Sequence, residues 1–354
     1  MSNRNEIVTI GKAVCIILMV IGHSGCPKFM FQFIYLFHMP FFFFVSGYFF
    51  KADKVLRDGY VFSKFKTLWF PFVKWSIVFL LLHNLLYKVG VLDTFLSIIT
   101  IIKRVCLIPF MYGDDELIGG FWFIKDLFYA TLFMIGLCSL PSIRKYGDKI
   151  ISNISFIGSF IVFGVSLFLY CHNHSVAFRE LCIMSSSLCF FITGYFISCN
   201  DRLNHIIMMP VGGGRLLILF AFLLAITWLL PVSKPYESLD FYYAPWILFA
   251  ALCGIVFVLD LSSVINNTIV RIPFVYIGEH TMSILIWHFS VFKVVSLIYV
   301  LVYGLPIPIV GIGRHLDYSI YMQGFGWLIY SVAGVCLPIL IPYFYSRYKK
   351  DSIE

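Results

Sequence analysis

The sequence predicts an all-α protein, a polytopic transmembrane helical bundle of about ten spans. Of its 354 residues, 60% are hydrophobic and only 12% are charged, and the mean hydropathy is +0.92. Apolar runs of roughly 20 residues recur along the chain, and each is long enough to cross about 30 Å of hydrocarbon. These three observations together argue against a soluble fold.

The expected spans follow one another through short connections. The first begins after a short polar segment and lacks a small-residue cleavage site, so we expect an uncleaved signal anchor. The stretch 93–109 is interrupted by Lys103 and Arg104, and we place it along the membrane interface, with an eleventh span as the alternative. The ten expected spans are 7–24, 33–50, 68–87, 120–140, 151–170, 181–199, 216–231, 243–262, 274–302 and 325–345.

The basic residues predict the orientation. Sixteen Lys and Arg residues fall on the side that holds both chain ends and seven on the other, so both termini are expected in the cytoplasm. The net charge of +8 then reflects this bias and contact with anionic membrane lipid, and it does not call for a nucleic-acid partner.

The chain is expected to be one integral membrane domain, 1–354, with no attached soluble domain. Its ten cysteines contain no C-x-x-C pair, and most lie in apolar runs, where Cys behaves as a small hydrophobe. We therefore expect no metal site, the pair His172 and His174 included, and no permanently bound cofactor. A Walker loop, a G-x-S-x-G elbow and an H-E-x-x-H helix are absent from the sequence, which argues against ATPase, serine hydrolase and zincin chemistry.

The first span carries Lys12 and, eleven positions later, His23. On a helix this spacing places both side chains on one face, about 16 Å apart. Ionisable groups inside a membrane are costly unless they pair, snorkel or line a wet cavity, so they are functional candidates. The two residues indicate a polar track along the span.

A second polar cluster opens the second span, in which His38 begins the run HMPFFFFVSGY and Ser46 lies within it. The short connection 25–32 makes the first two spans antiparallel neighbours and puts His23 and His38 near one membrane face. They are therefore expected to share a cavity. The phenylalanines 41–44 are expected to face lipid.

Two further clusters each begin a span, and the first of them enters the membrane from the external side. Trp122, Lys125 and Asp126 begin the fourth span, and the adjacent Lys125 and Asp126 point about 100° apart, so each is expected to pair with a different helix. The ninth span begins with Glu279, His280 and Ser283 and contains His288. Interhelical ion pairs and hydrogen bonds are the structural alternative for these residues.

These motifs resemble the acyltransferase-3 family of integral membrane O-acyltransferases, which decorate bacterial glycans. The resemblance rests on the Lys12 to His23 spacing followed by Ser24, and on the motifs FHMPFFFFVSGYFF, FWFIKDLF and IGEHTMSILIWHF, and it covers nearly the whole chain. One departure is Thr9, where the family often has Asp. The hydrolase-like C-terminal domain found in many members is also missing from the sequence.

The resemblance implies transfer of an acyl group, commonly acetyl, from acetyl-CoA to a hydroxyl of a carbohydrate or lipid-linked glycan, in the bacterial inner membrane. His23 would act as general base or as an acyl-accepting nucleophile, because imidazole titrates near neutral pH. Lys12, near the cytoplasmic mouth, would contact CoA. Lys64, Lys66 and Arg144 are weaker candidates for this contact. The alternative role for Lys12 is to snorkel to the lipid headgroups. The candidate catalytic residues are His23, Lys12 and His38, and the candidate substrate-binding residues are Trp122, Lys125, Asp126, Glu279, His288 and Ser46.

Two other classes of function fit parts of the sequence. A transporter or flippase for a glycan or acyl substrate would line its path with the same buried charges. The two halves of the chain lack the resemblance that inverted repeats would give, which counts against it. A membrane sensor or scaffold would not need several histidines at one depth.

Substitution of Lys12 tests whether the first span binds the acyl-CoA donor, as predicted. We expect Lys12→Ala to raise the KM for acyl-CoA, and Lys12→Arg to raise it less, because the charge is retained. The measurement is initial transfer rate against donor concentration in membranes that contain equal amounts of each variant. A KM that stays at the wild-type value in Lys12→Ala would assign the residue to snorkelling instead.

Overall fold

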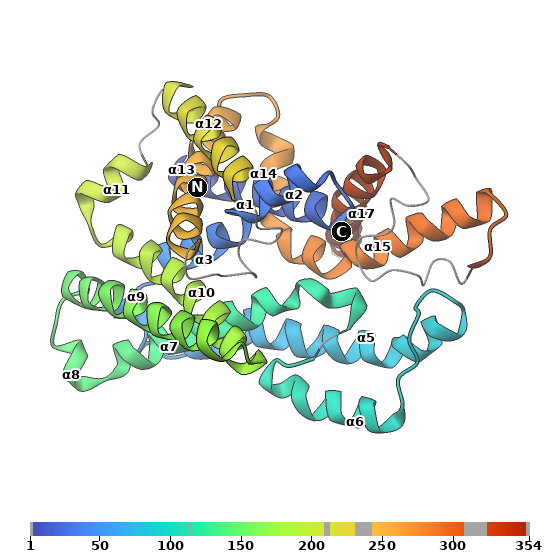
Figure 1. Ribbon diagram of the computed structural model, residues 1–354, viewed down its shortest axis with the longest axis horizontal. Coiled ribbons are helices and arrows are strands. Elements are labelled where there is room, and N and C mark those ends of the chain that lie inside the picture. The colour runs from blue at the N-terminus through green and yellow to red at the C-terminus, as the bar shows by residue number, and fades with distance from the viewer. Residues whose placement is uncertain (1–2, 114, 209–212, 231–242, 308–323, 352–354) are drawn as a thin grey trace. The chain divides into compact units, whose positions relative to one another are not determined.

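The computed structural model describes residues 3–113, 115–208, 213–230, 243–307 and 324–351 (Figure 1). All regular elements in these ranges are helices, which confirms the predicted fold class. Nine of the helical segments described are long and apolar enough to cross a membrane. The number becomes ten if α11 (Asp201–Met208) and α12 (Gly213–Leu229) form one span.

The chain divides into two compact units. The first unit consists of Met1–Cys15, Lys28–Lys66 and Asp126–Val275, and the second of Ile16–Pro27, Thr67–Lys125 and Tyr276–Glu354. Helix α1 (Asn3–His23) contributes to both.

The helices of the first unit surround a core rich in aromatic side chains. Besides part of α1, α11 and α12, this unit contains α2 (Lys28–Tyr35), α3 (His38–Tyr48), η1 (Ala52–Lys54), α4 (Tyr60–Lys64), most of α7 (Trp122–Ser139), α8 (Pro141–Arg144), α9 (Asp148–Asn173), α10 (Val176–Ser198), α13 (Ala244–Asn266) and the first half of α14 (Arg271–Glu279).

The second unit is built on four pairs of packed elements. Helix α15 (Thr281–Val302) packs against α17 (Gly326–Asp351) and against the short helix η4 (Glu116–Phe121), while α5 (Phe70–Lys88) packs against η3 (Ile108–Phe110) and η4. The elements of this unit are the end of α1, α5 (Phe70–Lys88), α6 (Ile98–Leu107), η3 (Ile108–Phe110), η4 (Glu116–Phe121), the start of α7, the end of α14, α15 (Thr281–Val302) and α17 (Gly326–Asp351).

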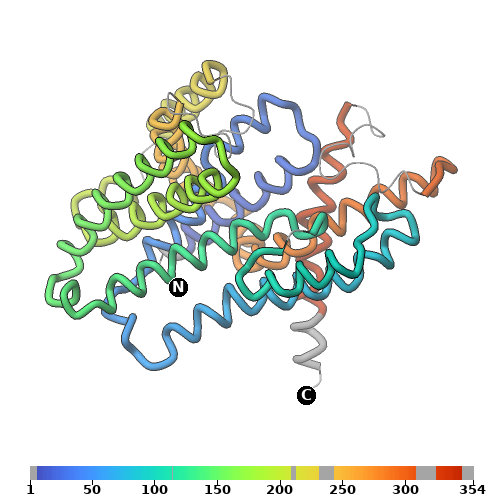
Figure 2. Tube along the Cα trace, turned by 60° about the horizontal axis from the view of Figure 1, so that its bottom comes forward, coloured from blue at the N-terminus to red at the C-terminus, as the bar shows by residue number. Residues whose placement is uncertain are grey.

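Glycines allow α3 to lie directly against α10. A Cβ atom on Gly47 would come within 1.7 Å of the Phe191 carbonyl oxygen, and one on Gly194 within 2.0 Å of the Phe44 carbonyl oxygen. Small residues at such crossings let the two backbones approach closely, as in many membrane bundles. Helix α9 runs along the same α10, as Figures 1 and 2 both show.

The phenylalanines 41–44 do not face lipid as expected. Phe41 and Phe43 are fully buried and Phe44 is 2% exposed. The reason is that α3 packs against both α10 and α13, so that little of its circumference is left uncovered. A helix that is apolar all round fits such a central position as well as it fits lipid, and sequence cannot separate the two.

Two expected spans are broken. The second span begins earlier than expected, at Lys28, and consists of α2 and α3 with a break at Leu36 and Phe37. The expected ninth span, 274–302, is two helices, because His280 leaves helical geometry and α15 begins only at Thr281. The other expected spans agree with the structure except at their ends, where helices extend by up to about eight residues.

Polar side chains satisfy the carbonyl groups released at these irregular points. Nδ1 of His280 lies 2.8 Å from the Tyr276 carbonyl oxygen, while the His280 amide donates instead to Ile277. In α17, Pro342 has no N–H for the Pro338 carbonyl, and the hydroxyl of Ser283 donates to that carbonyl at 2.7 Å. Such bonds are required because hydrocarbon offers no alternative partner.

The segment expected at the interface contains α6, which has ten residues. At 1.5 Å per residue it is about 15 Å long, too short to cross the hydrocarbon. The eleventh span considered for this region is therefore not formed.

Substitution of Gly47 tests the contact between α3 and α10. We expect Gly47→Ala to lower the melting temperature of the purified protein, because the helices must separate; overpacking of this kind costs about 1–3 kcal/mol. The matched control is Gly164→Ala on α9, where an added Cβ meets nothing within 4 Å and alanine favours the helix. Equal melting temperatures for the two variants would contradict the close packing.

Candidate active site

His23 closes α1, and its position is fixed by the residues that follow. Ser24 donates to the Ile21 carbonyl at 2.8 Å and accepts a hydrogen bond from Ser331 of α17 at 2.9 Å. Gly25 then takes a left-handed conformation with φ of 82°, which turns the chain away from the helix. The imidazole is thereby held at a defined helix end and remains half-buried.

His288 of α15 lies next to His23. The two ring centroids are 5.6 Å apart, and the ring of Phe289 lies 5.0 Å from that of His23. His288 is fully buried. Its Nδ1 lies 3.0 and 3.1 Å from the carbonyl oxygens of Ile284 and Leu285. Carbonyls only accept, so Nδ1 carries the proton, and Nε2 of the neutral ring is the nitrogen with a lone pair.

A cavity of about 280 Å³ lies in the same unit. Its wall includes Trp122 and Lys125 at the start of α7, Arg104 of α6 and the exposed Tyr112. Lys125 is 6% exposed, and its Nζ lies 4.7 Å from the centre of the Tyr112 ring. The structure thus brings together two predicted substrate-binding residues, Trp122 and Lys125, with Arg104, which was expected only as an interfacial charge.

The cavity wall is joined to the histidine pair through Gly120. A Cβ atom at this position would lie 2.9 Å from Leu285 and 3.8 Å from Cε1 of His288. Its neighbours Gly119 and Phe121 line the cavity. Because Gly120 has no side chain, the cavity wall lies directly against α15 at the level of His288.

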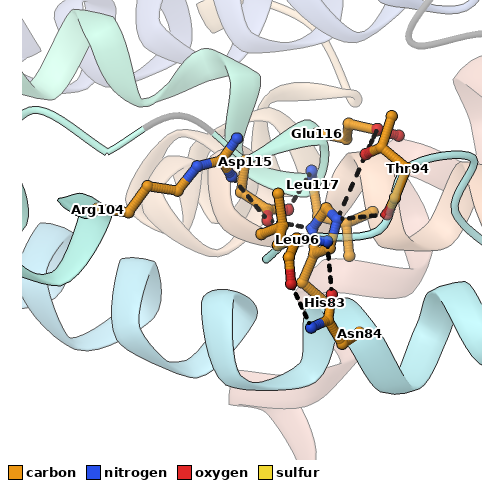
Figure 3. Close-up of polar contacts among 8 residues, drawn as sticks. All are labelled: His83, Asn84, Thr94, Leu96, Arg104, Asp115, Glu116 and Leu117. Atoms are coloured by element: carbon orange, nitrogen blue, oxygen red, sulfur yellow. Dashed lines mark hydrogen bonds and ion pairs between the residues drawn. The ribbon is translucent and has the colours of Figure 1, made fainter. Parts of the chain in front are cut away.

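A buried ion network, missed by sequence reasoning, supports this wall (Figure 3). Nδ1 of His83 lies 2.6 Å from Oδ2 of Asp115, and Nε2 lies 3.0 Å from the Thr94 carbonyl oxygen. Arg104 approaches the same Asp115 oxygen at 3.8 Å. Carboxylate and carbonyl oxygens both accept, so both nitrogens of His83 donate and the ring is an imidazolium. His83 therefore has no lone pair for base catalysis, and its role is structural: it holds α5 to Thr94 and Asp115.

The same network orders the start of η4. Oδ1 of Asp115 accepts a hydrogen bond from the Leu117 amide at 3.1 Å, and Oε1 of Glu116 accepts one from Thr94 at 3.2 Å. Lys293 of α15, which is 4% exposed, interacts electrostatically with Glu116. The sequence offered two signals for this network: His83 lies in an apolar span, and Asp115 lies just before the FWF motif. Only the fold shows that they are in contact.

Four predicted site residues belong to the first unit. His38 is 1% exposed, with Nδ1 2.8 Å from the Ile34 carbonyl oxygen, and Ser46 donates to the Phe42 carbonyl within its own helix. Asp126 accepts from Ser187 of α10 at 3.3 Å, so it does contact another helix as expected. Lys12 is half-buried on α1, which runs unbroken to His23.

The cavity expected to contain both His23 and His38 stays a prediction, because these residues belong to different units. Glu279 lies exposed at the end of α14. Ser283 is used to satisfy the Pro338 carbonyl.

Other nucleophiles and metals receive no support near the pair. Burial raises the pKa of the Cys26 thiol, three residues after His23, to about 11, so at neutral pH it is not a thiolate. Within the part of the chain that the structure describes, no group of three or more His, Cys, Asp or Glu side chains could hold a metal ion.

The fold and the site together define a multi-pass helical membrane protein in which half-buried His23 and buried His288 form a pair beside a cavity lined by two cations. The acyltransferase-3 family model, described as an acyltransferase domain, matches residues 5–347, and the chain belongs to this family. It is accordingly a membrane acyltransferase. No curated protein and no solved structure gives a significant match.

Removal of His83 tests its structural role. We expect His83→Ala to destabilise the protein by about 3–5 kcal/mol, because Asp115 and Thr94 lose their partner in a buried site. The control is Arg57→Ala, which removes an ion pair with Asp53 whose side chains are 64% and 55% exposed and whose loss costs about 0–1 kcal/mol. Thermal unfolding of both purified variants gives the comparison; similar shifts would argue against a structural role for His83.

Proposed function

We propose that this acyltransferase moves an acyl group, with acetyl as the expected group, from acyl-CoA to a hydroxyl of a cell-surface or lipid-linked sugar. The observation that carries the proposal is the pair His23 and His288 in a chain of the acyltransferase-3 family. An imidazole held at a helix end inside a membrane protein has the chemistry that acyl transfer to a hydroxyl needs.

In the simplest route His23 is the general base. The sugar oxygen attacks the thioester carbonyl carbon while its proton passes to His23, a new C–O bond forms, and the C–S bond breaks. The proton then passes from His23 to the departing thiolate, which leaves as CoA. The partial negative charge at the C-terminal end of α1 favours the transient imidazolium.

A covalent route uses the same residue. A ring nitrogen of His23 attacks the thioester, CoA leaves as the thiol, and an acyl-imidazole forms. The sugar hydroxyl then attacks the acyl carbon, which releases the imidazole. Both routes give one ester and one CoA for each thioester consumed.

His288 is proposed as the positioning residue for His23. Its Nδ1 proton is directed at two backbone carbonyls, which fixes the ring and aims Nε2 away from the α15 backbone. A fixed neighbour of this kind restricts the orientation of His23, and restriction of a catalytic base to its reactive geometry increases the rate. His38, held in the same tautomer in the first unit, is a second catalytic candidate.

The donor is proposed to reach the enzyme from the cytoplasm. With both termini on that side of a bacterial inner membrane, Lys12 would lie near the cytoplasmic mouth and meet a phosphate or carbonyl oxygen of CoA. Lys64, Lys66 and Arg144 are weaker candidates for the nucleotide. Trp122 and Lys125 would contact the sugar acceptor, with Asp126, Glu279 and Ser46 as further candidates.

A transfer assay tests the proposal. Membranes containing the wild-type chain or His23→Ala are incubated with radiolabelled acetyl-CoA, and host glycolipids and polysaccharides are then separated. We expect label in a glycan fraction with the wild type and loss of transfer with His23→Ala, because the base or acyl acceptor is missing. His172→Ala, which removes an exposed histidine of α9, is the control and should label like the wild type.

Equal amounts of inserted protein in all three membranes are verified by quantitative detection of a terminal tag. Wild-type labelling by His23→Ala would overturn the catalytic assignment. Absence of label from folded wild-type protein with every acyl-CoA offered would overturn the proposed donor class.

A further inference from the structure

An apolar groove in the first unit is lined by residues of α7, α9 and α10 and by the α8 segment. Its volume is about 200 Å³, and no charged side chain lines it among the residues that the structure describes. Ile151, Leu188 and Ile192 are buried and form its floor, whereas Phe133 and Ile154 on its rim are 51% and 58% exposed. The groove is therefore open along one side, and because α7, α9 and α10 belong to membrane spans, that side faces lipid.

The groove has the length of one lipid chain. From Ile151 to Val162, both of which line it, α9 advances by eleven residues, or about 16 Å at 1.5 Å per residue. This length is about half of the hydrocarbon thickness of about 30 Å, which is the depth of one leaflet. Gly158 also lines the groove, and a Cβ atom at this position would meet nothing within 4 Å. An unfilled groove forfeits van der Waals contacts, so a hydrocarbon chain is the occupant that suits it.

Three exposed cations lie at the end of the groove where α8 joins α7 to α9 (Figure 1). Arg144 and Lys145 are flanked in the chain by Ile143 and Tyr146, which both line the groove. Nζ of Lys145 lies 5.1 Å from the centre of the Tyr146 ring. Lys149 follows in the first turn of α9. Among the residues that the structure describes, none of the three cations forms an ion pair.

Asp148 is the one carboxylate between positions 141 and 149 of the sequence. It acts electrostatically on Cys138 of α7 and on Cys199, which follows α10, and it lies in the first turn of α9, where the helix dipole favours an anion. Three cations and one carboxylate leave this segment with a net positive charge. The segment is on the side of the membrane expected to be cytoplasmic, where anionic lipids are enriched and basic sites beside membrane helices bind their headgroups.

We propose that the groove binds one acyl chain of an anionic membrane phospholipid, with the lipid phosphate beside Arg144, Lys145 and Lys149. The groove supplies the position of the chain but little selectivity, because bilayer hydrocarbon is as apolar as the groove. The preference for an anionic lipid comes from the cations. The proposal does not rest on the proposed function, and it competes with the weaker assignment of Arg144 to the CoA nucleotide.

Native mass spectrometry of the full chain in detergent tests the proposal without any acyl transfer. The protein is titrated with dioleoyl phosphatidylglycerol and with dioleoyl phosphatidylcholine, which has the same chains and a zwitterionic headgroup. We expect one phosphatidylglycerol to bind about tenfold or more tightly than phosphatidylcholine, the size of effect that cations near a membrane surface supply. Because this lipid binds the folded protein, it should also raise the melting temperature.

Filling the groove locates the site. Gly158→Leu places a side chain where the lipid chain would lie, and it should weaken phosphatidylglycerol binding about tenfold or more and remove the rise in melting temperature. Gly164→Leu is the matched control, because it makes the same change on α9 at a position with open space that does not line the groove. It should bind phosphatidylglycerol like the wild type. Melting curves without added lipid verify that both variants are folded.

Removal of the cations tests the headgroup contact separately. Lys145→Gln/Lys149→Gln should reduce the preference for phosphatidylglycerol about tenfold or more, because the charges that attract the phosphate are lost. The control is Lys51→Gln/Lys54→Gln, which removes two other exposed cations on the same expected side of the membrane, neither of which lines the groove. This control should keep the preference.

Equal binding of the two lipids by the wild type would overturn the proposal, as would equal effects of Gly158→Leu and Gly164→Leu in folded protein. Tighter binding of palmitoyl-CoA than of phosphatidylglycerol, lost in Gly158→Leu, would also overturn it, because the groove would then belong to an acyl donor. Failure of the proposed function has a different signature, namely selective binding of phosphatidylglycerol by protein that transfers no acyl group.

Discussion

The structure depends on one constraint: each polar group inside the bundle must find a partner within the protein, because hydrocarbon provides none. Where helices break or end, side chains satisfy the exposed carbonyls, as His280 does for Tyr276 and Ser283 does for Pro338. The same requirement fixes the tautomer of His288, since its Nδ1 must serve the carbonyls of its own helix. Site geometry is therefore a consequence of how the bundle satisfies its backbone.

Hydropathy was sufficient to predict the helical class and the approximate position of most spans, because the length of an apolar run is set by membrane thickness. It could not predict the interruptions. His280 lies inside one long expected span, and hydropathy gives no sign that α14 ends just before it, four residues after Tyr276, whose hydroxyl donates to the Ile339 carbonyl of α17. The burial of Phe41 was missed for a similar reason, because a central helix and a lipid-facing helix are equally apolar.

The residues of the site were predicted to different degrees. His23 could be singled out by its spacing from Lys12 on one helix, and His288 by its place in an apolar span. Their proximity could not, since 265 positions separate them and the contact arises from the packing of α1 and α15 within the second unit. His83 and Asp115 lay outside every motif, and only tertiary structure joins them across α5 and the η4 segment. Arg104 was expected only as an interfacial charge because it lies in a connecting segment, yet it lines the cavity.

The central claim is that His23 and His288 act as one catalytic unit. The direct measurement is kcat for acyl transfer by His23→Ala, His288→Ala and the double variant, each verified as folded and assayed at saturating donor. The account predicts that His288→Ala lowers kcat by about 100-fold or more with little change in donor KM, and that the double variant is no slower than His23→Ala. A wild-type kcat for His288→Ala, or losses that multiply in the double variant, would contradict it.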